Sequence, residues 1–469
     1  MTSWDAIVLG AGPAGIAAAT RLAAGGARVL VIDENPAPGG QIWRGVETAS
    51  AQRLALLGPD YRYGKQRVAA LRASQATLAL NTTLWRAEPE GTVWLKTPAG
   101  IERHQSAHLV LAVGAMERPV PRPGWTLPGI TTIGGLQILL KKNGILPAGP
   151  LLLAGTGPLF YLYAMQCLKA GKQDLTLLDT ALRRNWLRAA VALPRALGGE
   201  GSRYLYKGTG LLAALRLSRV AFFSGVHDIA IEQDASRDER VLRCVSGGKT
   251  RTFRAQHIGL HEGVIPDQHV ARALGCEFLW DAVASTFIPR RSAQLESSTA
   301  GVFIAGDAGG IGGYAVAEAE GRLAASVILH RLGKLDAVAM EQECRQADRL
   351  RRRHLAARPL LDRLYATAPE VLAPPDQTLI CRCEEVSCGA VRDALRQGAS
   401  GPNQVKAFLR TGMGPCQGRL CAPTVAQLVA TQRHLSPAQA GFYHIRPPFT
   451  PITVGELAAL DQEKAPPDA

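Results

Sequence analysis

A glycine motif near the N-terminus places the strongest constraint on how this chain folds. Gly10, Gly12 and Gly15 follow a short apolar stretch, residues 5–10, and lead into the helix-forming sequence IAAATRLAAGG. A second apolar stretch, ARVLVID, ends at Asp33, which is 18 positions after the last glycine. An apolar strand, a glycine turn, a helix and a second strand in this order predict a βαβ unit.

This unit has the features of a dinucleotide site. The first glycine permits the tight turn, the second lets a pyrophosphate approach the backbone, and the third lets helix and strand pack closely. The helix N-terminus then faces the phosphates, and the acidic residue after the second strand accepts the ribose hydroxyls. The predicted contacts are Gly10, Gly12, Pro13, Ala14, Gly15 and Asp33, with Glu34 as the alternative acid.

Further glycine segments follow in a set order. GGQ comes directly after the first unit, a strand ends at Gly114 before a proline-rich crossover, and the stretch 301–313 is a strand that runs into AGDAGGIGG. Together they resemble the two-dinucleotide-domain flavoproteins, the relatives of thioredoxin reductase and glutathione reductase. The resemblance implies FAD, with the Asp of the GD pair at the ribityl and phosphate part and backbone of LNTTLW at the adenine end. The residues it implies are Gly40, Gln41, Thr83, Leu84, Gly114, Gly306, Asp307 and Gly313.

The middle of the chain repeats the nucleotide pattern in a weaker form. A strand, Gly155 and Gly157, a helix and a second strand ending at Asp179 follow one another. In the flavoprotein reductases that this chain resembles, the inserted domain binds NAD(P)H. Here the third glycine position is Phe160, whose bulk should push the helix from the strand or remake the turn. We therefore predict that this domain does not use NAD(P)H.

Two cysteine pairs near the C-terminus predict a metal centre. Cys381 and Cys383 form a C-x-C pair, and Cys416 and Cys421 form a second pair after a gap of 32 residues. Structural zinc usually takes pairs with spacers of about two to four residues, so the one-residue spacer suits an iron–sulfur cluster better. The motifs CRCEEV and GPCQGRLC resemble the bacterioferritin-associated-ferredoxin-like [2Fe-2S] domain. Cys388 is predicted to stay unbound.

The remaining cysteines do not predict redox chemistry. The chain contains no C-x-x-C motif, so the disulfide centre of the disulfide reductases is missing. Cys167, Cys244, Cys276 and Cys344 stand alone in apolar or helical surroundings, which is typical of small core residues.

Composition excludes several classes of protein. With 47% hydrophobic and 20% charged residues, the chain is expected to be folded and globular. No apolar run is long enough for a membrane span, and the N-terminus lacks the basic start and cleavage site of a signal peptide. We expect a cytoplasmic location, with peripheral attachment at the inner membrane as an alternative. The net charge of +14 is spread along the chain without a nucleic-acid motif, so no nucleic-acid partner is expected.

The predicted fold class is α/β. It comprises two Rossmann-like dinucleotide-binding domains of the disulfide-reductase flavoprotein type and a small all-α C-terminal [2Fe-2S] domain. The predicted boundaries are 1–125 and 285–335 for a discontinuous FAD-binding domain, 126–284 for the inserted degenerate NAD(P)-type domain, 336–375 for a helical link, 376–435 for the [2Fe-2S] domain and 436–469 for a tail.

The whole order of segments resembles one family over nearly its full length. This family is the large (alpha-type) component of multi-subunit FAD/[2Fe-2S] amino-acid dehydrogenases. It includes the A subunits of opine oxidases, D-hydroxyproline dehydrogenase alpha, dye-linked L-proline dehydrogenase alpha and the B subunit of hydrogen cyanide synthase. The closing sequence YHIRPPFTPITVGELAAL is similar to the tail of that family.

The resemblance implies a hetero-oligomeric, dye- or quinone-linked oxidoreductase in which this chain relays electrons between flavin and cluster. A glycine-oxidase-like FAD beta subunit would oxidise the substrate C–N bond, and some members add a small ferredoxin-like gamma subunit. In some members ATP or ADP takes the place of FAD, and FMN lies at a subunit interface. The alternatives are a stand-alone NAD(P)H-dependent reductase and a non-enzymatic, nucleotide-stabilised scaffold. No catalytic residue is assigned to this chain.

Overall fold

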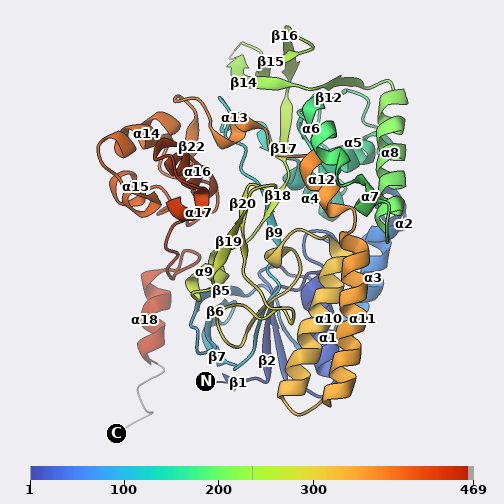
Figure 1. Cartoon of the computed structure of the whole chain (residues 1–469), viewed down its shortest axis with the longest axis vertical. Helices are drawn as coiled ribbons and strands as arrows, with labels where there is room; N and C mark the ends of the chain where they lie inside the picture. The colour runs from blue at the N-terminus through green and yellow to red at the C-terminus, as the bar shows by residue number, and fades with distance from the viewer. Residues whose placement is uncertain (1, 235, 463–469) are drawn as a thin grey trace.

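A five-stranded parallel sheet forms the core of the first lobe (Figure 1). The computed structural model describes residues 2–234 and 236–462. The strands, in spatial order, are β21 (Val302–Ile304), β8 (Leu109–Leu111), β2 (Ala6–Leu9), β3 (Val29–Ile32) and β4 (Thr77–Ala79). All neighbours are parallel, so their carboxyl ends share one edge, and three of the glycine segments begin there.

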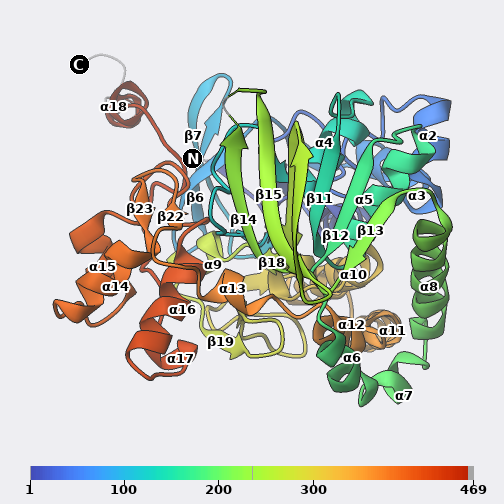
Figure 2. The ribbon, with the colours of Figure 1, turned by 90° about the horizontal axis from the view of Figure 1, so that it is seen from above.

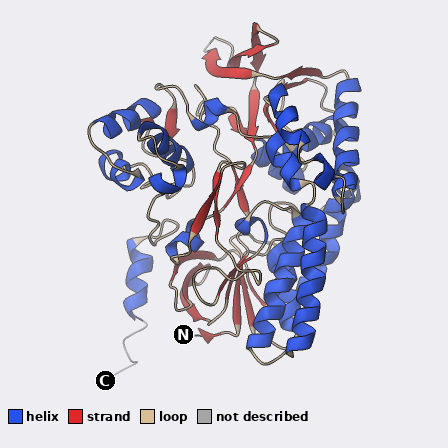
Figure 3. Ribbon diagram, viewed as in Figure 1, coloured by secondary structure: helices blue, strands red, loops and turns tan. Residues whose placement is uncertain are grey.

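Two of the helices of the first lobe, α1 and α10, pack closely against each other through small residues. Gly321 of α10 lets that helix approach α1, because a Cβ atom at Gly321 would lie 2.1 Å from the carbonyl oxygen of Ala14. The helix α11 returns beside α10, and Figure 3 shows the two as a long pair along one side of the molecule. The bounds are α1 (Pro13–Ala24), α2 (Ala51–Leu57), α3 (Pro59–Arg72), α10 (Tyr314–Arg331) and α11 (Ala337–Leu355).

Smaller sheets complete the first lobe and connect it to the second. A four-stranded sheet has the order β1 (Thr2–Ser3), β7 (Gly100–Gln105), β6 (Thr92–Thr97) and β5 (Thr83–Ala87). Two antiparallel pairs are β9 (Ala115–Glu117) with β18 (Val264–Pro266), and β19 (Phe278–Asp281) with β20 (Thr286–Pro289). In the chain, the helix α9 (His269–Ala273) lies between β18 and β19, and the 3-10 turn η1 (Gly306–Gly309) follows β21.

A second parallel sheet forms the inserted lobe, as the repeated nucleotide pattern predicts. Its order is β10 (Ile130–Thr132), β17 (His257–Glu262), β11 (Leu151–Thr156), β12 (Leu175–Asp179) and β13 (Ala221–Ser224). Figure 2 shows a separate antiparallel sheet beside it, made of β14 (His227–Asp234), β15 (Glu239–Ser246) and β16 (Lys249–Ala255). The helices are α4 (Ile133–Asn143), α5 (Pro158–Lys169), α6 (Arg183–Ala190), α7 (Leu193–Ala196) and α8 (Gly201–Leu217).

The C-terminal lobe is helical, as predicted, with one short antiparallel strand pair added to it. The link to this lobe consists of α11, α12 (Arg358–Leu364) and α13 (Pro369–Leu372). The lobe contains β22 (Leu379–Cys381), β23 (Val386–Ser387), α14 (Cys388–Arg396), α15 (Pro402–Leu409), α16 (Ala422–Gln432) and α17 (Pro437–Ala440), and α18 (Val454–Gln462) follows. Across the described ranges, each helix is too short or too polar to span a bilayer.

Candidate functional site: a nucleotide cradle and a four-thiol centre

The first glycine turn is held tightly against the parallel sheet. Gly10 has a φ of +100°, and a Cβ atom there would lie 2.4 Å from the carbonyl oxygen of Ala112. A Cβ atom at Gly15 would lie 1.8 Å from the carbonyl oxygen of Gly10. Neither position accommodates a side chain, so the turn that joins β2 to α1 requires glycine at both positions, as the sequence predicts.

Gly12 faces open space at the start of α1. A Cβ atom at Gly12 would meet only the Cα atom of Gly40, at 3.8 Å, although its φ of −79° suits any residue. Gly40 has a φ of +57°, and its own Cβ atom would lie 2.9 Å from the Cα atom of Gly12. The two glycines therefore leave a cradle beside the unpaired N–H groups of the helix N-terminus, where an anionic phosphate is favoured.

Asp33 holds the same turn from the end of β3. Its side chain is 8% exposed, and its carboxylate accepts hydrogen bonds from the backbone N–H of Ala11 at 2.8 Å and from both nitrogens of Asn35 at 2.9 and 2.8 Å. Glu34 is exposed. Asp33 thus fixes the glycine turn, and a ribose contact by either acid stays a prediction.

The segment that contains Asp307 lies against the first glycine turn. A Cβ atom at Gly306 would lie 2.9 Å from the Cβ atom of Ala14. One carboxylate oxygen of Asp307 accepts the N–H groups of Gly312 and Gly313, at 2.8 and 3.0 Å, and so shapes the turn before α10. The Gly306 N–H donates at 2.8 Å to Glu320, whose buried carboxylate pairs with Arg291 and Arg351.

The other predicted nucleotide contacts occupy the surrounding segments. Thr83 and Leu84 begin β5, and the preceding residue donates its N–H to the carbonyl of Asp33 at 3.0 Å. Gln41 is exposed, and its carbonyl accepts a hydrogen bond from Lys141 at 3.0 Å. Burial, together with the charge of Arg44, lowers the pKa of the Lys141 ammonium to about 7.

In the inserted lobe, side chains of the chain itself occupy the third glycine position and contact the acid at the end of β12. Phe160 is fully buried within α5, and the next residue, Tyr161, donates a hydrogen bond from its hydroxyl to the carboxylate of Asp179 at 3.0 Å. The ring of Tyr365, from the helical link, lies 5.8 Å from that of Tyr161. A cavity of about 190 Å³ remains beside them. The acid at the end of β12 therefore already has an internal partner.

The four predicted cluster ligands lie in the C-terminal lobe as two pairs. The sulfur atoms of Cys383 and Cys416 are 3.9 Å apart, and the Cys421 thiol donates a hydrogen bond that lowers the pKa of Cys381 to about 6. Cys381 and Cys421 are buried, Cys383 is exposed, and Cys416 is half-buried. Each pair joins one thiol from each motif.

This arrangement fits a two-iron cluster. Two thiolates on one tetrahedral metal ion, with bonds of ~2.3 Å, lie roughly 3.8 Å apart, which is close to the Cys383–Cys416 separation. Within residues 2–234 and 236–462, no three Cys, His, Asp or Glu side chains converge as ligands of one ion. Two sulfur pairs suit two irons, whereas a single zinc ion requires all four sulfurs around one centre.

Cys388 points to a different partner. Its thiol is fully buried and donates to the carbonyl of Pro374 at 3.2 Å. Burial raises the pKa of the Cys388 thiol to about 11, which disfavours the thiolate that a metal requires. Cys167, Cys244 and Cys276 are buried as well, in agreement with a core role, and Cys344 is half-buried.

The loop between Cys416 and Cys421, called the cluster loop here, contacts residues 267–269, which directly follow β18. Arg419 pairs with Asp267 at 3.4 Å, and the Asp267 N–H donates to the carbonyl of Gly114 at 3.1 Å. His269 lies 2.8 Å from the carbonyl oxygen of Gln417. Burial opposes ionisation of Asp267, but hydrogen bonding from His269 and the charge of Arg419 outweigh it and hold the pKa of Asp267 well below its usual range.

Sequence comparison agrees with these two sites. Residues 379–431 match the BFD-like [2Fe-2S] binding domain family, and residues 4–183 match the pyridine nucleotide-disulphide oxidoreductase family. The A subunit of opine oxidase from Rhizobium meliloti (strain 1021) is 55% identical over 461 residues, which cover 98% of this chain and 99% of that protein. Hydrogen cyanide synthase subunit HcnB of Pseudomonas protegens is 31% identical, with 98% and 99% coverage.

Structural comparison extends the likeness to the whole fold. L-Proline dehydrogenase from P. horikoshii superposes with a TM-score of 0.70 at 18% sequence identity, and the match covers 97% of this chain and 79% of that one. The fold and the two sites define a flavin- and iron–sulfur-dependent oxidoreductase subunit that transfers electrons, with FAD and a [2Fe-2S] cluster as its cofactors. Within that class, the chain belongs to the family of the opine oxidase A subunits, as its sequence motifs predict.

Several residues at these sites are not predicted from the sequence. The hydroxyl of Tyr443 lies 3.9 Å from the Cys421 sulfur and donates to Thr411 at 2.9 Å, so the tail covers the cluster loop. The Asp267–Arg419 contact joins positions 152 residues apart. No local motif marks these residues, and only the resemblance of the tail to its family points toward Tyr443.

Replacing Gly12 tests the nucleotide cradle. We expect Gly12→Val to fold, because the added side chain meets no protein atom closely, and to lose bound nucleotide, because it fills the pyrophosphate position. The measurement is nucleotide released from the denatured, purified protein. Gly210→Val, at an open position on α8, is the control and should retain nucleotide. Full retention by Gly12→Val would show that this turn is not the phosphate site.

Single replacements of the thiols test the cluster. The unmodified chain, prepared without oxygen, should contain about two irons and two sulfides and give an EPR signal after one-electron reduction. Cys381→Ser, Cys383→Ser, Cys416→Ser and Cys421→Ser should each lose iron, whereas Cys388→Ser should keep it. Stoichiometric zinc without iron would contradict the assignment.

Proposed function

We propose that this chain is the electron-transferring alpha subunit of a multi-subunit, dye- or quinone-linked amino-acid or opine dehydrogenase. The observation that carries the proposal is the contact between the cluster loop and the first lobe, from Cys416 through Arg419 and Asp267 to Gly114. It supports a short route between the flavin side and the cluster side of one chain. A flavin accepts a pair of electrons, and a [2Fe-2S] cluster passes them on singly.

Substrate chemistry would take place on a partner. A glycine-oxidase-like FAD beta subunit would take hydride from the C–H next to nitrogen, while the nitrogen loses its proton, and water would hydrolyse the resulting imine to an amine and a carbonyl compound. The opine oxidase and hydrogen cyanide synthase relatives are each named as subunits, which supports a hetero-oligomer. A ferredoxin-like gamma subunit, an interfacial FMN and a cytoplasmic location belong to the same proposal.

The residues and boundaries predicted from the sequence complete the proposal. The FAD contacts are those named around the glycine turns, and Cys381, Cys383, Cys416 and Cys421 hold the cluster. The division into FAD-binding, inserted, linking, [2Fe-2S] and tail segments keeps the boundaries given above. ATP or ADP in place of FAD remains the alternative for the first cradle.

The inserted lobe favours a partner as the source of electrons. In a nicotinamide-dependent reductase, the acid after the second strand of this lobe receives the ribose hydroxyls. Here the Tyr161 hydroxyl already donates a hydrogen bond to the Asp179 carboxylate, and the ring of Tyr365 packs against that of Tyr161. Burial raises the pKa of the Asp179 carboxyl, which further weakens a role as an anionic ribose acceptor.

An exposed surface on α6, α7 and α8 suits a partner protein. Figure 2 shows these helices together at one edge of the molecule. Large apolar side chains stand exposed on them, namely Trp186, Leu187, Val191, Leu193, Leu197, Tyr206 and Leu217. Seven arginines and one lysine lie among residues 183–219, with a single acid, Glu200. We infer that a partner with an apolar centre and an acidic rim docks here.

Assay of the native assembly tests the function. The tagged chain, purified from its native cell, should bring other subunits with it, and that assembly should reduce an artificial dye with an opine or an amino acid. The chain alone should not, and neither NADH nor NADPH should bleach its flavin. Rapid bleaching by NADPH would instead identify a stand-alone reductase, and bound ATP without flavin or iron would identify a scaffold.

Introducing negative charge on the exposed surface tests the docking site. The double variant Leu187→Asp, Val191→Asp should lose its partner subunits while retaining nucleotide and iron, because it buries carboxylates in an apolar contact. Val338→Asp, a similarly exposed apolar position on α11, is the matched control and should keep its partners. Equal recovery of partners with both variants would place the interface elsewhere.

A further inference from the structure

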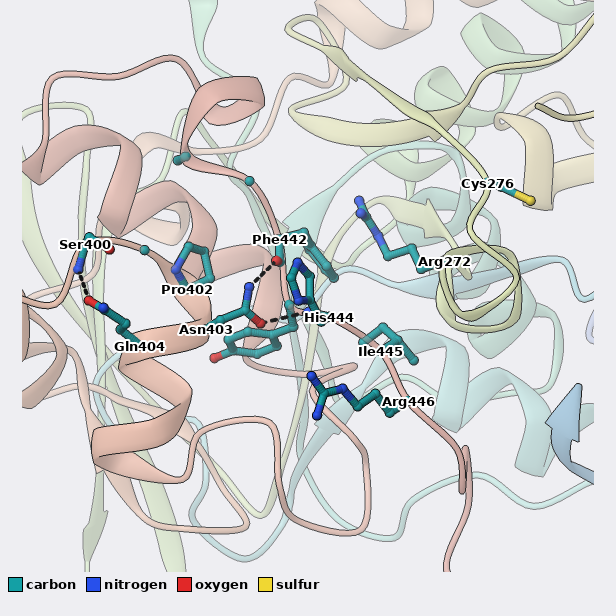
Figure 4. Close-up of a pocket in the computed structure, with 14 residues that line it drawn as sticks. Arg272, Cys276, Ser400, Pro402, Asn403, Gln404, Phe442, His444, Ile445 and Arg446 are labelled. Atoms are coloured by element: carbon teal, nitrogen blue, oxygen red, sulfur yellow. Dashed lines mark hydrogen bonds between the residues drawn. The ribbon is translucent and has the colours of Figure 1, made fainter. Parts of the chain in front are cut away.

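A pocket of about 630 Å³ lies between the C-terminal lobe and α9 (Figure 4). Arg272 enters it from α9, residues 400–404 form the wall at the start of α15, and residues 440–446 of the tail form the opposite wall. None of the 14 residues that line it is acidic, whereas Arg272, His444 and Arg446 are basic residues. The pocket lies outside the nucleotide cradle and the four-thiol centre.

Arg272 carries a buried charge without a counter-charge. Its Nε donates at 2.9 Å to Gln268, while its Nη2 is buried and has no hydrogen-bond partner. No carboxylate in the described residues forms an ion pair with it. Burial lowers the pKa of its guanidinium to about 9, and no negative charge offsets that effect. A cation in this position is unfavourable unless an anion joins it.

Aromatic rings fix the orientation of this guanidinium. Its central carbon lies 4.0 Å from the ring centre of Phe442, 4.1 Å from that of Phe278 and 4.9 Å from that of Phe287. Aromatic faces attract the cation but do not accept its in-plane N–H groups, so Nη2 still lacks an acceptor. The ring stack therefore preorganises a planar donor group at the pocket, which suits an oxyanion.

We propose that this pocket binds an organic anion, through a carboxylate or phosphate group held by Arg272 and Arg446. A pocket of this volume is in the size range of small-molecule sites and is much larger than a simple ion requires. Its walls combine apolar side chains, such as Ile445, with polar ones, such as Ser400 and Asn403, which fits a molecule with both kinds of group.

An anion in this pocket affects the cluster, a consequence that rests on the proposed cluster ligands. Tyr443 forms part of the pocket wall, and its hydroxyl lies 3.9 Å from the Cys421 sulfur. A negative charge on one side of Tyr443 disfavours the addition of an electron on the other side. Occupancy therefore lowers the reduction potential of the cluster, and reduction of the cluster weakens anion binding by the same factor.

Calorimetric titration of the purified full-length chain tests the pocket. The probes are pyruvate, succinate and inorganic phosphate. Binding of a carboxylate probe alone identifies the carboxylate class, and binding of phosphate alone identifies the phosphate class. Arg446→Gln should weaken binding by about tenfold to a hundredfold, as expected for one charged hydrogen bond. Arg272→Lys, which keeps the charge but not the planar fork, should weaken it as well.

Controls separate this inference from the proposed function. Arg396→Gln removes a cation that already pairs with Asp393 on α14, outside the pocket, and should leave binding unchanged. An EPR-monitored redox titration should show a lower midpoint potential with the bound probe, and no shift in Arg446→Gln. Absence of binding by all three probes, or equal binding by the pocket variants, overturns the inference. A chain that contains no iron but still binds the anion would contradict only the assignment of the cluster, not that of the pocket.

Discussion

The relative placement of the three lobes depends on a buried ion pair between Arg122 and Glu262. Arg122 lies in the crossover that leaves the first lobe, Glu262 ends β17 of the inserted sheet, and both are almost fully buried at a distance of 2.7 Å. A second bond, at 2.5 Å, joins Arg122 to Glu370 of α13, on the way to the C-terminal lobe. Because an unpaired charge in this position costs several kcal/mol, separating any of the three segments from the others is unfavourable.

The same crossover also reaches the cluster lobe. The indole N–H of Trp125 donates at 2.6 Å to the carbonyl of Leu379, two residues before Cys381. On the other side of the lobe, Arg419 and Gln417 contact Asp267 and His269. The cluster loops are therefore attached at two points to the polypeptide that leaves and re-enters the first lobe. Such attachment keeps two redox sites at a fixed separation, which favours electron transfer over a freely tethered arrangement.

Local patterns predict the parts of this structure that local physics determines. The turn at Gly10 and Gly15 has no room for side chains, so the glycine motif alone predicts the βαβ unit. The cysteine spacing likewise predicts that the two motifs share one site, although the structure pairs the thiols across the motifs, Cys383 with Cys416 and Cys381 with Cys421. The partner of Asp33 is not predictable in this way, because the carboxylate bonds to the turn itself. Contacts such as Asp267 with Arg419, and the ring stack around Arg272, join distant segments, and no periodicity or spacing encodes them.

The inserted lobe shows why a preserved pattern does not imply a preserved ligand. Its parallel sheet, its two glycines and the terminal Asp179 all remain. Two adjacent aromatic residues differ from the pattern: Phe160 is fully buried at the third glycine position, and Tyr161 donates a hydrogen bond to Asp179. The helical link then packs Tyr365 over the pair. A ribose that bonded to Asp179 would have to displace the Tyr161 hydrogen bond, and the link that carries Tyr365 is also joined to the Arg122 pair through Glu370. The packing around Asp179 and the contacts that place the cluster lobe therefore share the same helical link.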